Sequence, residues 1–432
     1  MKDPGDEMQF KLVSLGFILY SRSEAEGEIV GKGDRREAAD RDLGPRDVSG
    51  TASQEKEKGF PGKALLIFKR SIGKEPFLSL LLFLLFLFSL INPGGVLLYP
   101  SYVDWRTLAA LAGLLMVTSG LKESGYFDRI TVKMLEGLKS ERKIALFLIM
   151  ISAGLSTFLT NDIALFVVVP LTLSMGDRIE GDVTKLIVFE ALAVNVGSTL
   201  TPIGNPQNLF LWHLWGISFL EFIVRMLPVT VLVLGVLVLF ARLTFPEDRV
   251  AVKVIEKDVY GNRGIFILSL VLMLLYVVAL ELRWTEFALP FLFIVYFITS
   301  RRVLLRADWL LILLFAAVFI DFHILSELPL VDRVVSSLSS GHPSRVFLLS
   351  AALSQLVSNV PAAVLMSKFT DKWQALAYGV NVGGNGLVIA SLANLIALRL
   401  GGRRGAFGLF HRYSIPFFLI TLLASCVFFF LL

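Results

Sequence analysis

Two short polar stretches interrupt apolar parts of the chain, and their residue types could bind a small ion. The first is Thr160-Asn161-Asp162, and the second is Ser358-Asn359. Irregular backbone at membrane depth is tolerated only where protein or a water-filled cavity covers it, so both stretches are interpreted as tips of re-entrant helical hairpins. At such a tip one helix ends with free carbonyl oxygens, which can hold a cation, and the next begins with free N–H groups, which attract an anion.

The alternative is that these residues only cap helices at the membrane surface, since Asn and Asp are good N-cap residues. The recurrence of the pattern in two equivalent places favours the hairpins. Asp162 needs its own account, because an ionised carboxylate would repel each negative charge of an anion by ~4 kcal/mol at ~4 Å for an effective dielectric constant near 20. We therefore expect Asp162 to be protonated during anion binding, to bind a cation, to point away from the site, or to cap the helix predicted at 163–176.

Two longer polar stretches follow the hairpins: "NVGSTLTPIGNPQN" at 195–208 and "NVGGNGLVIASLAN" at 381–394. Their Gly, Pro, Asn and Thr residues break a helix, and broken helices at matching places in two halves point to a binding site between them. The alternative is that single glycines, such as Gly384 or Gly386, are packing notches between helices. The candidate substrate- and ion-binding residues are Thr160, Asn161, Asp162, Asn195, Gly197, Ser198, Thr199, Thr201, Gly204, Asn205, Asn208, Ser358, Asn359, Asn381, Gly383, Gly384, Asn385, Ser391 and Asn394.

Three further ionisable residues in apolar segments are candidates for proton coupling, namely Glu190, Asp321 and His323. An Asp with a His two residues later could relay protons, although this pair could instead lie near the outer membrane interface. The chain has a single cysteine, Cys426, and its four histidines are far apart. We therefore expect no cofactor and no metal other than Na⁺ as a coupling ion.

The elements that must position these residues are predicted to be transmembrane helices. The 432 residues are 55% hydrophobic and 18% charged, with a mean hydropathy of +0.71. Several continuous apolar runs approach the ~20 residues needed to cross a bilayer, without the alternation of a β-barrel. The predicted fold is an all-α polytopic membrane protein, with an interfacial helix at 126–139. The predicted spans are 77–99, 105–121, 184–211, 225–244, 263–282, 286–304, 309–328, 374–398 and 413–432, and the interrupted segments are 142–176 and 344–370.

The chain also carries the signs of an internal duplication. A displacement of 204 residues places the Asp-Trp pair at 104–105 on that at 308–309, one of 198 places "LSTFLTN" on "LSQLVSN", and one of 186 places "VNVG" on "VNVG". An odd number of crossings separates the copies, which predicts an inverted-topology repeat with two re-entrant hairpins and two broken helices. We assign the first membrane repeat to 63–250 and the second, inverted one to 251–432.

Residues 1–62 have a different composition, and we predict that they are disordered. Between 21 and 60, 18 of 40 residues are charged, with few large apolar side chains. In the membrane part, the positive-inside rule places the N-terminus in the cytoplasm, the first hairpin entering from inside and the second from outside. The basic residues on the inner side are Lys69, Arg70, Lys74, Lys133, Lys139, Arg142, Lys143, Arg242, Arg249, Lys253, Lys257, Arg301, Arg302, Arg306, Arg403 and Arg404.

At the hairpin tips and at "FEALAVNVGSTLTPIGNPQNLFLW" the chain resembles the ion-transporter superfamily, over about residues 75–432. The branches of that superfamily include arsenite permeases, NhaD-type sodium–proton antiporters, citrate–metal symporters and dicarboxylate–sodium symporters. The resemblance implies a homodimer in which a scaffold domain holds a transport domain that moves like an elevator. An ATPase partner is implied only if the chain is like the arsenite permeases.

The resemblance also implies two sites. The first would be built by Thr160, Asn161, Asn195, Gly197 and Thr199, and the second by Ser358, Asn359, Asn381, Gly383 and Asn385. The chain departs from the dicarboxylate branch, which has Ser-Asn-Thr at both tips, because here the tips read Thr-Asn-Asp and Ser-Asn-Val.

The leading functional hypothesis is a secondary active transporter in the plasma membrane that moves a small anion or oxyanion, coupled to Na⁺ or H⁺. The acids Asp162 and Glu190 favour a sodium–proton antiporter as the alternative, and a channel is a third possibility. A membrane enzyme is disfavoured because no nucleophile with a base and no suitable carboxylate pair is found. The chain has no Walker A motif, which argues against direct ATP use, and its scattered basic residues argue against a nucleic-acid partner.

Overall fold

The computed structural model describes residues 76–126, 140–174, 183–247, 261–339, 342–401 and 405–431. The secondary-structure elements within these ranges are all helices, which confirms the predicted fold class. Four of the described helices are long and apolar enough to cross a membrane, namely 219–244, 263–281, 309–326 and 406–429. The predicted disordered segment at 1–62, and the interfacial helix at 126–139 apart from Tyr126, lie outside the described residues.

The first half of the described chain contains nine helical elements within those ranges, and two of them are one turn or little more. They are α3 (Pro76–Ile91), η1 (Pro93–Leu98), α4 (Tyr99–Tyr102), α5 (Trp105–Glu123), α7 (Glu141–Phe158), α8 (Asn161–Ser174), α9 (Val183–Ser198), α10 (Pro206–Trp215) and α11 (Phe219–Thr244). The predicted span 77–99 is therefore not one helix. It ends at Ile91 because Asn92 and Pro93 begin a separate 3₁₀ turn, in which the Asn92 side chain accepts the N–H of Gly95.

The second half begins after the undescribed residues 248–260. Its elements are α12 (Arg263–Glu281), α13 (Thr285–Thr299), α14 (Arg301–Arg306), α15 (Trp309–Ser326), α16 (Pro329–Ser339), α17 (Pro343–Val357), α18 (Asn359–Met366), α19 (Trp373–Gly383), η2 (Val388–Ala390), α20 (Leu392–Gly401), α21 (Ala406–Cys426) and η3 (Val427–Leu431). The predicted span 286–304 is two helices, and the last span begins at Ala406 rather than near 413. Both interrupted segments and both broken helices appear as pairs of helices.

One local arrangement occurs at the start of both α5 and α15, which begin 204 residues apart. The indole N–H of Trp105 donates to the carbonyl of Pro100 at 2.8 Å, and that of Trp309 donates to the carbonyl of Leu304 at 2.8 Å. In each case the Asp before the Trp caps the helix by accepting a backbone N–H. The sequence match at this displacement therefore corresponds to the same hydrogen-bonded turn.

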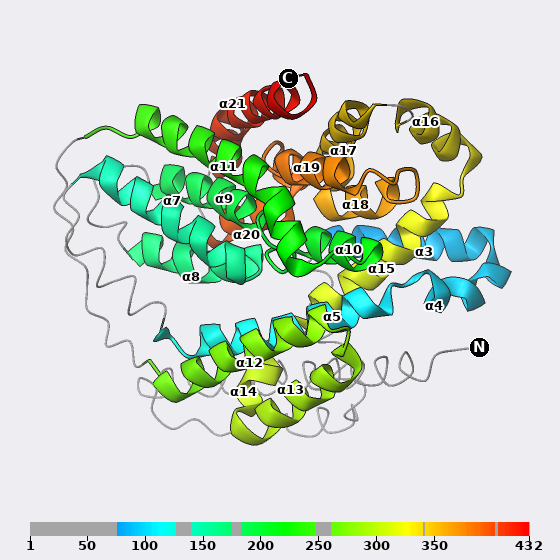
Figure 1. Ribbon diagram of the computed structural model, residues 1–432, viewed down its shortest axis with the longest axis horizontal. Helices are drawn as coiled ribbons and strands as arrows, with labels where there is room; N and C mark the ends of the chain where they lie inside the picture. Colours follow the sequence, from blue (N-terminus) through cyan, green and yellow to red (C-terminus); the bar gives the residue numbers. More distant parts are fainter. Residues whose placement is uncertain are drawn as a thin grey trace, which may run out of the picture.

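The helices form two groups that are visible in Figure 1. Helix α5 packs against α12, α13 and α14, and these four lie together in the lower part of the view. The other group contains the hairpins and broken helices: α7 packs on α9, α17 packs on α19, and α10 contacts both α18 and α19. Helix α15 packs against α3, α5 and α18, so it contacts both groups.

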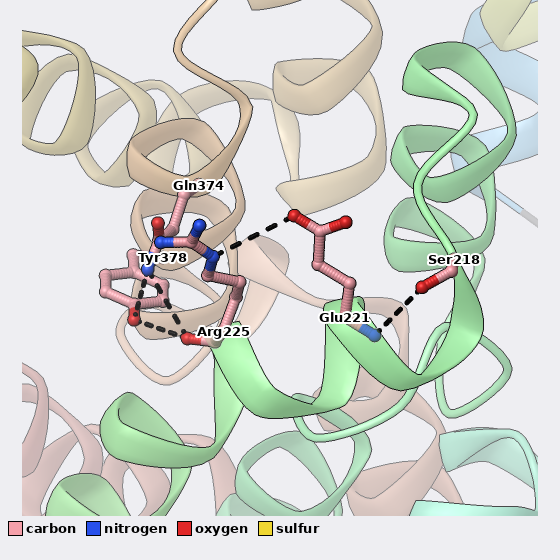
Figure 2. Close-up of polar contacts among 5 residues, drawn as sticks. All are labelled: Ser218, Glu221, Arg225, Gln374 and Tyr378. Carbon is pink, nitrogen blue, oxygen red and sulfur yellow. Dashed lines mark hydrogen bonds and ion pairs between the residues drawn. The ribbon is translucent and has the colours of Figure 1, made fainter.

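Polar contacts fix the start of α11 to the start of α19 (Figure 2). The Tyr378 hydroxyl donates to the carbonyl of Arg225 at 2.6 Å, and the Gln374 amide donates to the same carbonyl at 3.4 Å and to the Tyr378 hydroxyl at 2.9 Å. The first turn of α11 is capped by the Ser218 hydroxyl, which accepts the N–H of Glu221 at 3.2 Å. Helix α19 therefore enters the second helix break from a fixed starting point.

Candidate functional site

The first hairpin tip lies where α7 ends and α8 begins. Leu159 is extended, and Thr160, Asn161 and Asp162 are all buried. The backbone N–H of Asn161 donates to the carbonyl of Gly204 at 3.1 Å, and its side-chain oxygen accepts the N–H of Asp162 at 3.1 Å. The tip is thus bonded directly to the loop between α9 and α10.

The second hairpin tip, between α17 and α18, has a strained backbone. Ser358 has φ 80° and ψ 156°, a combination that is almost restricted to glycine and costs of order 1–3 kcal/mol. The Asn359 side-chain oxygen accepts the N–H of Val360 at 2.9 Å, as its counterpart does at the first tip. A Cβ added to Gly384 would lie 3.2 Å from the Asn359 amide nitrogen, so this tip lies beside the second helix break.

The break between α9 and α10 is closed by two asparagines from the start of α10. The Asn208 amide lies 3.2 Å from the carbonyl oxygen of Ser198, 3.1 Å from that of Thr199 and 3.2 Å from that of Thr201. The Asn205 amide donates to the Ser198 carbonyl at 3.1 Å, and its side-chain oxygen caps α10 by accepting the Asn208 N–H at 2.9 Å. Carbonyls that lose their helical partners at the break therefore receive side-chain donors.

The break between α19 and α20 is closed in the same way, 186 residues later. The Asn394 amide donates to the carbonyls of Gly384 at 2.9 Å and Leu387 at 3.3 Å. The Gln355 side chain adds two bonds, because its amide donates to the Gly383 carbonyl at 2.6 Å and its oxygen accepts the Leu387 N–H at 2.7 Å. Asn208 and Asn394 thus hold carbonyls at equivalent positions of their own breaks.

The two breaks are also bonded to each other, and the bonds are reciprocal. The Asn195 amide donates to the Asn394 side-chain oxygen at 2.8 Å, and the Asn381 amide donates to the Asn208 side-chain oxygen at 2.7 Å. Each bond joins the end of one broken helix to the start of the other, and the two bonds exchange when 186 is added to or subtracted from every number. We call these four residues the asparagine network.

A second pair of bonds follows the same rule. The Ser391 hydroxyl donates to the Asn195 side-chain oxygen at 3.0 Å, and the Asn205 amide donates to the Asn381 side-chain oxygen at 2.9 Å. The Thr199 hydroxyl also lies 3.4 Å from that Asn381 oxygen. Candidate residues that are more than 170 positions apart therefore form one buried polar cluster.

The glycines at the breaks are where helices approach most closely. A Cβ on Gly197 would lie 2.0 Å from the carbonyl oxygen of Ala153, and one on Gly383 would lie 2.7 Å from the Cβ of Ser354. A Cβ on Gly204 would lie 2.4 Å from the carbonyl oxygen of Ser198. No larger residue fits at these three positions without a backbone shift, as expected for sites of close helix packing.

Three residues of this region were not among the predicted site residues. The Thr157 hydroxyl donates to the Gly197 carbonyl at 3.1 Å, as Gln355 does to that of Gly383, and Gln207 lies 3.5 Å from the Asn381 side-chain oxygen. Thr157 and Gln355 both occupy the third position of the matched blocks "LSTFLTN" and "LSQLVSN". The alignment of the blocks therefore contained a signal for them, and Gln207 lies within "TPIGNPQN".

Four buried polar atoms around the network have no hydrogen-bond partner among the described residues. They are Oγ1 of Thr160, Oδ1 of Asp162, Oε1 of Gln207 and Oδ1 of Asn385. Gln207 and Asn385 both reach Asn381, through its side-chain oxygen at 3.5 Å and its carbonyl at 3.3 Å. An unpaired buried polar atom costs about 1–3 kcal/mol, so these atoms are the ones that a bound ion or substrate could satisfy.

The three proton-coupling candidates lie in different surroundings. One carboxyl oxygen of Glu190 accepts the Thr172 hydroxyl and the other has no described partner, and neither oxygen of Asp321 has one. His323 is only partly buried and lies 3.3 Å from Glu327 at the end of α15. Glu190 and Asp321 are therefore buried acids, whereas His323 pairs towards the helix end.

Within the described residues, no group of three or more His, Cys, Asp or Glu side chains could hold a metal ion. The oxygens that the cluster offers are carbonyl, amide and hydroxyl oxygens with the Asp162 carboxyl group. Such neutral oxygens, with at most one carboxylate, suit Na⁺ as a transported ion rather than a transition metal.

The all-α fold, its apolar spans and this buried polar cluster at two helix breaks define a polytopic membrane transporter. The family model described as "Citrate transporter" matches residues 64–372. The chain therefore belongs to the citrate transporter family, as the resemblance to the ion-transporter superfamily predicted.

Relatives support this assignment over most of the chain. The "Inner membrane protein YbiR" of Escherichia coli (strain K12) is 39% identical over 362 residues, which is 84% of this chain and 97% of the relative. The "Uncharacterized transporter MJ0456" of Methanocaldococcus jannaschii is 37% identical over 321 residues, which is 73% of this chain and 86% of the relative.

Proposed function

We propose that the chain is a secondary active transporter that moves a small anion or oxyanion across the plasma membrane, coupled to Na⁺ or H⁺. The observation that carries this proposal is the buried cluster at the two breaks. Both hairpin tips reach it, the asparagine network joins its halves, and four polar atoms around it lack a protein partner. A structural core would pair such atoms with each other, whereas a binding site leaves them for cargo.

The inverted repeat is part of the proposal. Bonds that exchange on adding or subtracting one fixed number are what a two-fold relation between two copies produces. Two oppositely oriented copies around one site are the architecture that lets a transporter open the site to either side in turn. The repeated Trp contacts at α5 and α15 support the same duplication.

The binding chemistry follows from the helix ends. Helices α8, α10, α18 and α20 all begin at the cluster, and their first N–H groups favour a negatively charged group. The carboxyl group of Asp162 at the first tip would oppose an anion unless a proton or a cation accompanies it. This conflict is a physical reason for coupling: the anion and the coupling ion bind best together.

Movement is proposed to follow the two groups of helices. The group around α5, α12, α13 and α14 would be the scaffold and would form a homodimer, and the group with both hairpins would be the transport domain. Glu190, which is buried in the second group, is the proton-coupling candidate that would travel with the cargo. The family description makes a carboxylate such as citrate the first substrate to test.

The experiment is a flux measurement with purified protein in proteoliposomes, preceded by a thermal-shift screen of arsenite, sulfate, phosphate, citrate, succinate and Na⁺ across pH. A ligand that binds the folded protein raises its unfolding temperature. We expect one anion to stabilise the protein and to be accumulated when a Na⁺ or H⁺ gradient is imposed. Absence of anion uptake under every gradient would refute the proposal.

A sodium–proton antiporter is the second candidate, because Asp162 and Glu190 each bury a carboxyl oxygen without a described partner. The same proteoliposomes distinguish it. An antiporter would move protons in response to a Na⁺ gradient with no anion substrate present, and an anion symporter would not.

A further inference from the structure

A cavity of about 430 Å³ lies between α5, α8, α14, α15 and α20, separate from the polar cluster. Its volume falls in the range of about 300–1,000 Å³ that is usual for small-molecule sites. It lies between the two groups of helices, because α5 and α14 belong to one and α8 and α20 to the other. A ligand in this cavity would contact both groups at once.

The cavity combines apolar walls with a basic rim. Leucines and isoleucines such as Leu115, Leu314 and Ile396 form most of the wall. The charged residues of the lining are listed here in full: Lys122, Arg306 and Arg399 are basic, and Asp308 is acidic. The rim therefore carries a positive excess next to a surface made of hydrocarbon.

The basic residues are anchored on different helices. The Lys122 ammonium on α5 lies 3.9 Å from the centre of the Phe166 ring on α8, which draws it across the cavity. Arg306 on α14 is held by both carboxyl oxygens of Glu123, each at 2.8 Å. Arg399 is on the last turn of α20. Lys122 and Arg399 thus approach the cavity from its two sides.

This combination selects the chemistry of an occupant. A small hydrophilic anion would meet Leu and Ile side chains that cannot hydrogen-bond to it, which is costly. A neutral lipid would leave the basic rim unused. An acidic head group attached to hydrocarbon satisfies both parts, and basic pockets between transmembrane helices bind anionic lipids in this way.

We propose that this cavity binds an anionic phospholipid, whose head group lies at Lys122 and Arg399 and whose acyl chain lies along α5, α8 and α20. The lipid bridges the two groups of helices, so it stabilises the arrangement in which they pack as observed here. The site is independent of the cargo, and its test does not need transport activity.

The test measures lipid binding to purified protein by native mass spectrometry and by thermal shift. The probes are phosphatidylglycerol, phosphatidylcholine and inorganic phosphate. The double variant Lys122→Gln/Arg399→Gln is compared with Arg302→Gln/Arg412→Gln, which removes the same charge from exposed arginines that do not line the cavity. We expect phosphatidylglycerol to stabilise the wild type and the control, and to bind about 30-fold more weakly to the first variant, from the usual contribution of two basic residues.

A second variant keeps the test decisive if the double variant does not fold. Ile396→Trp fills the cavity and leaves every charge in place, and it should reduce phosphatidylglycerol binding while the protein still folds. Equal phosphatidylglycerol binding by Lys122→Gln/Arg399→Gln and its control would overturn the proposal. So would equal stabilisation by phosphatidylcholine, which shows that the acid group is not read, or by inorganic phosphate, which shows that the hydrocarbon is not needed.

Discussion

The asparagine network makes an unequal prediction for two equivalent residues, Asn208 and Asn394. Substitution of either by Ala removes one bond between the breaks and the donor to the carbonyls of its own break. In the Asn208→Ala variant, the Ser198 carbonyl keeps its bond from Asn205. The Thr199 carbonyl loses its Asn208 donor, and the Thr201 carbonyl keeps only a long bond of 3.4 Å from a backbone N–H.

The Asn394→Ala variant leaves its carbonyls better satisfied. The Gly384 carbonyl keeps a bond from the Asn195 amide at 3.2 Å, and the Leu387 carbonyl keeps one from the N–H of Ala390 at 3.0 Å. At about 1–3 kcal/mol for each buried group left unpaired, we expect Asn208→Ala to lower the free energy of unfolding by about 2–5 kcal/mol. Asn394→Ala should cost about 0.5–1.5 kcal/mol, the usual net value of one hydrogen bond.

The assay is thermal and denaturant unfolding of both variants in the same detergent, with Asn262→Ala as the control. Asn262 is exposed, and its side chain accepts one N–H at the start of α12, so its loss should cost about 1 kcal/mol, as for other N-caps. The reasoning is refuted if Asn208→Ala is as stable as the control, or if Asn394→Ala is the less stable of the pair.

Three further predictions concern the hairpin tips and the glycines. Asn161→Ala and Asn359→Ala should each abolish transport and leave expression near the wild-type level; uptake retained by both variants would remove the binding role of the tips. Ser358→Gly should relieve the backbone strain and raise the unfolding free energy by about 1 kcal/mol, within the range of such strain, and no gain in thermal stability would contradict it. Gly197→Ala should prevent folding because its Cβ would lie 2.0 Å from a backbone carbonyl oxygen, whereas Gly235→Ala in α11, where the Cβ would meet nothing within 4 Å, should be neutral or stabilising in size-exclusion and thermal assays.

The sequence predicted the helix breaks and hairpins from strong local signals. Asn161 and Asn359 stand out because a polar side chain between apolar arms needs a reason, and the Gly and Pro residues at 195–208 cannot continue a helix. Boundaries were predicted less well where two short helices follow each other. Arg301 begins a new helix after Ser300 within one continuous apolar pattern, so periodicity alone joined α13 to α14.

The missed residues show a different limit. Thr157 and Gln355 are ordinary polar residues one or two turns before each tip, and nothing in their composition marks them as carbonyl donors. Their role depends on α7 lying on α9 and α17 lying on α19, which brings the carbonyls of Gly197 and Gly383 within reach. A side chain that serves a distant backbone group cannot be identified from its own neighbours in the sequence.

The sequence by itself determined that this chain is an all-α membrane protein and where its helices break, because hydrocarbon length and backbone propensity act over neighbouring residues. Only the tertiary structure decided which buried groups serve each other. Asn195 and Asn394 are 199 positions apart, and their bond exists because two broken helices meet. The same packing leaves the polar atoms of Asp162, Gln207 and Asn385 without a described protein partner, since satisfaction of a buried group depends on what the fold places beside it.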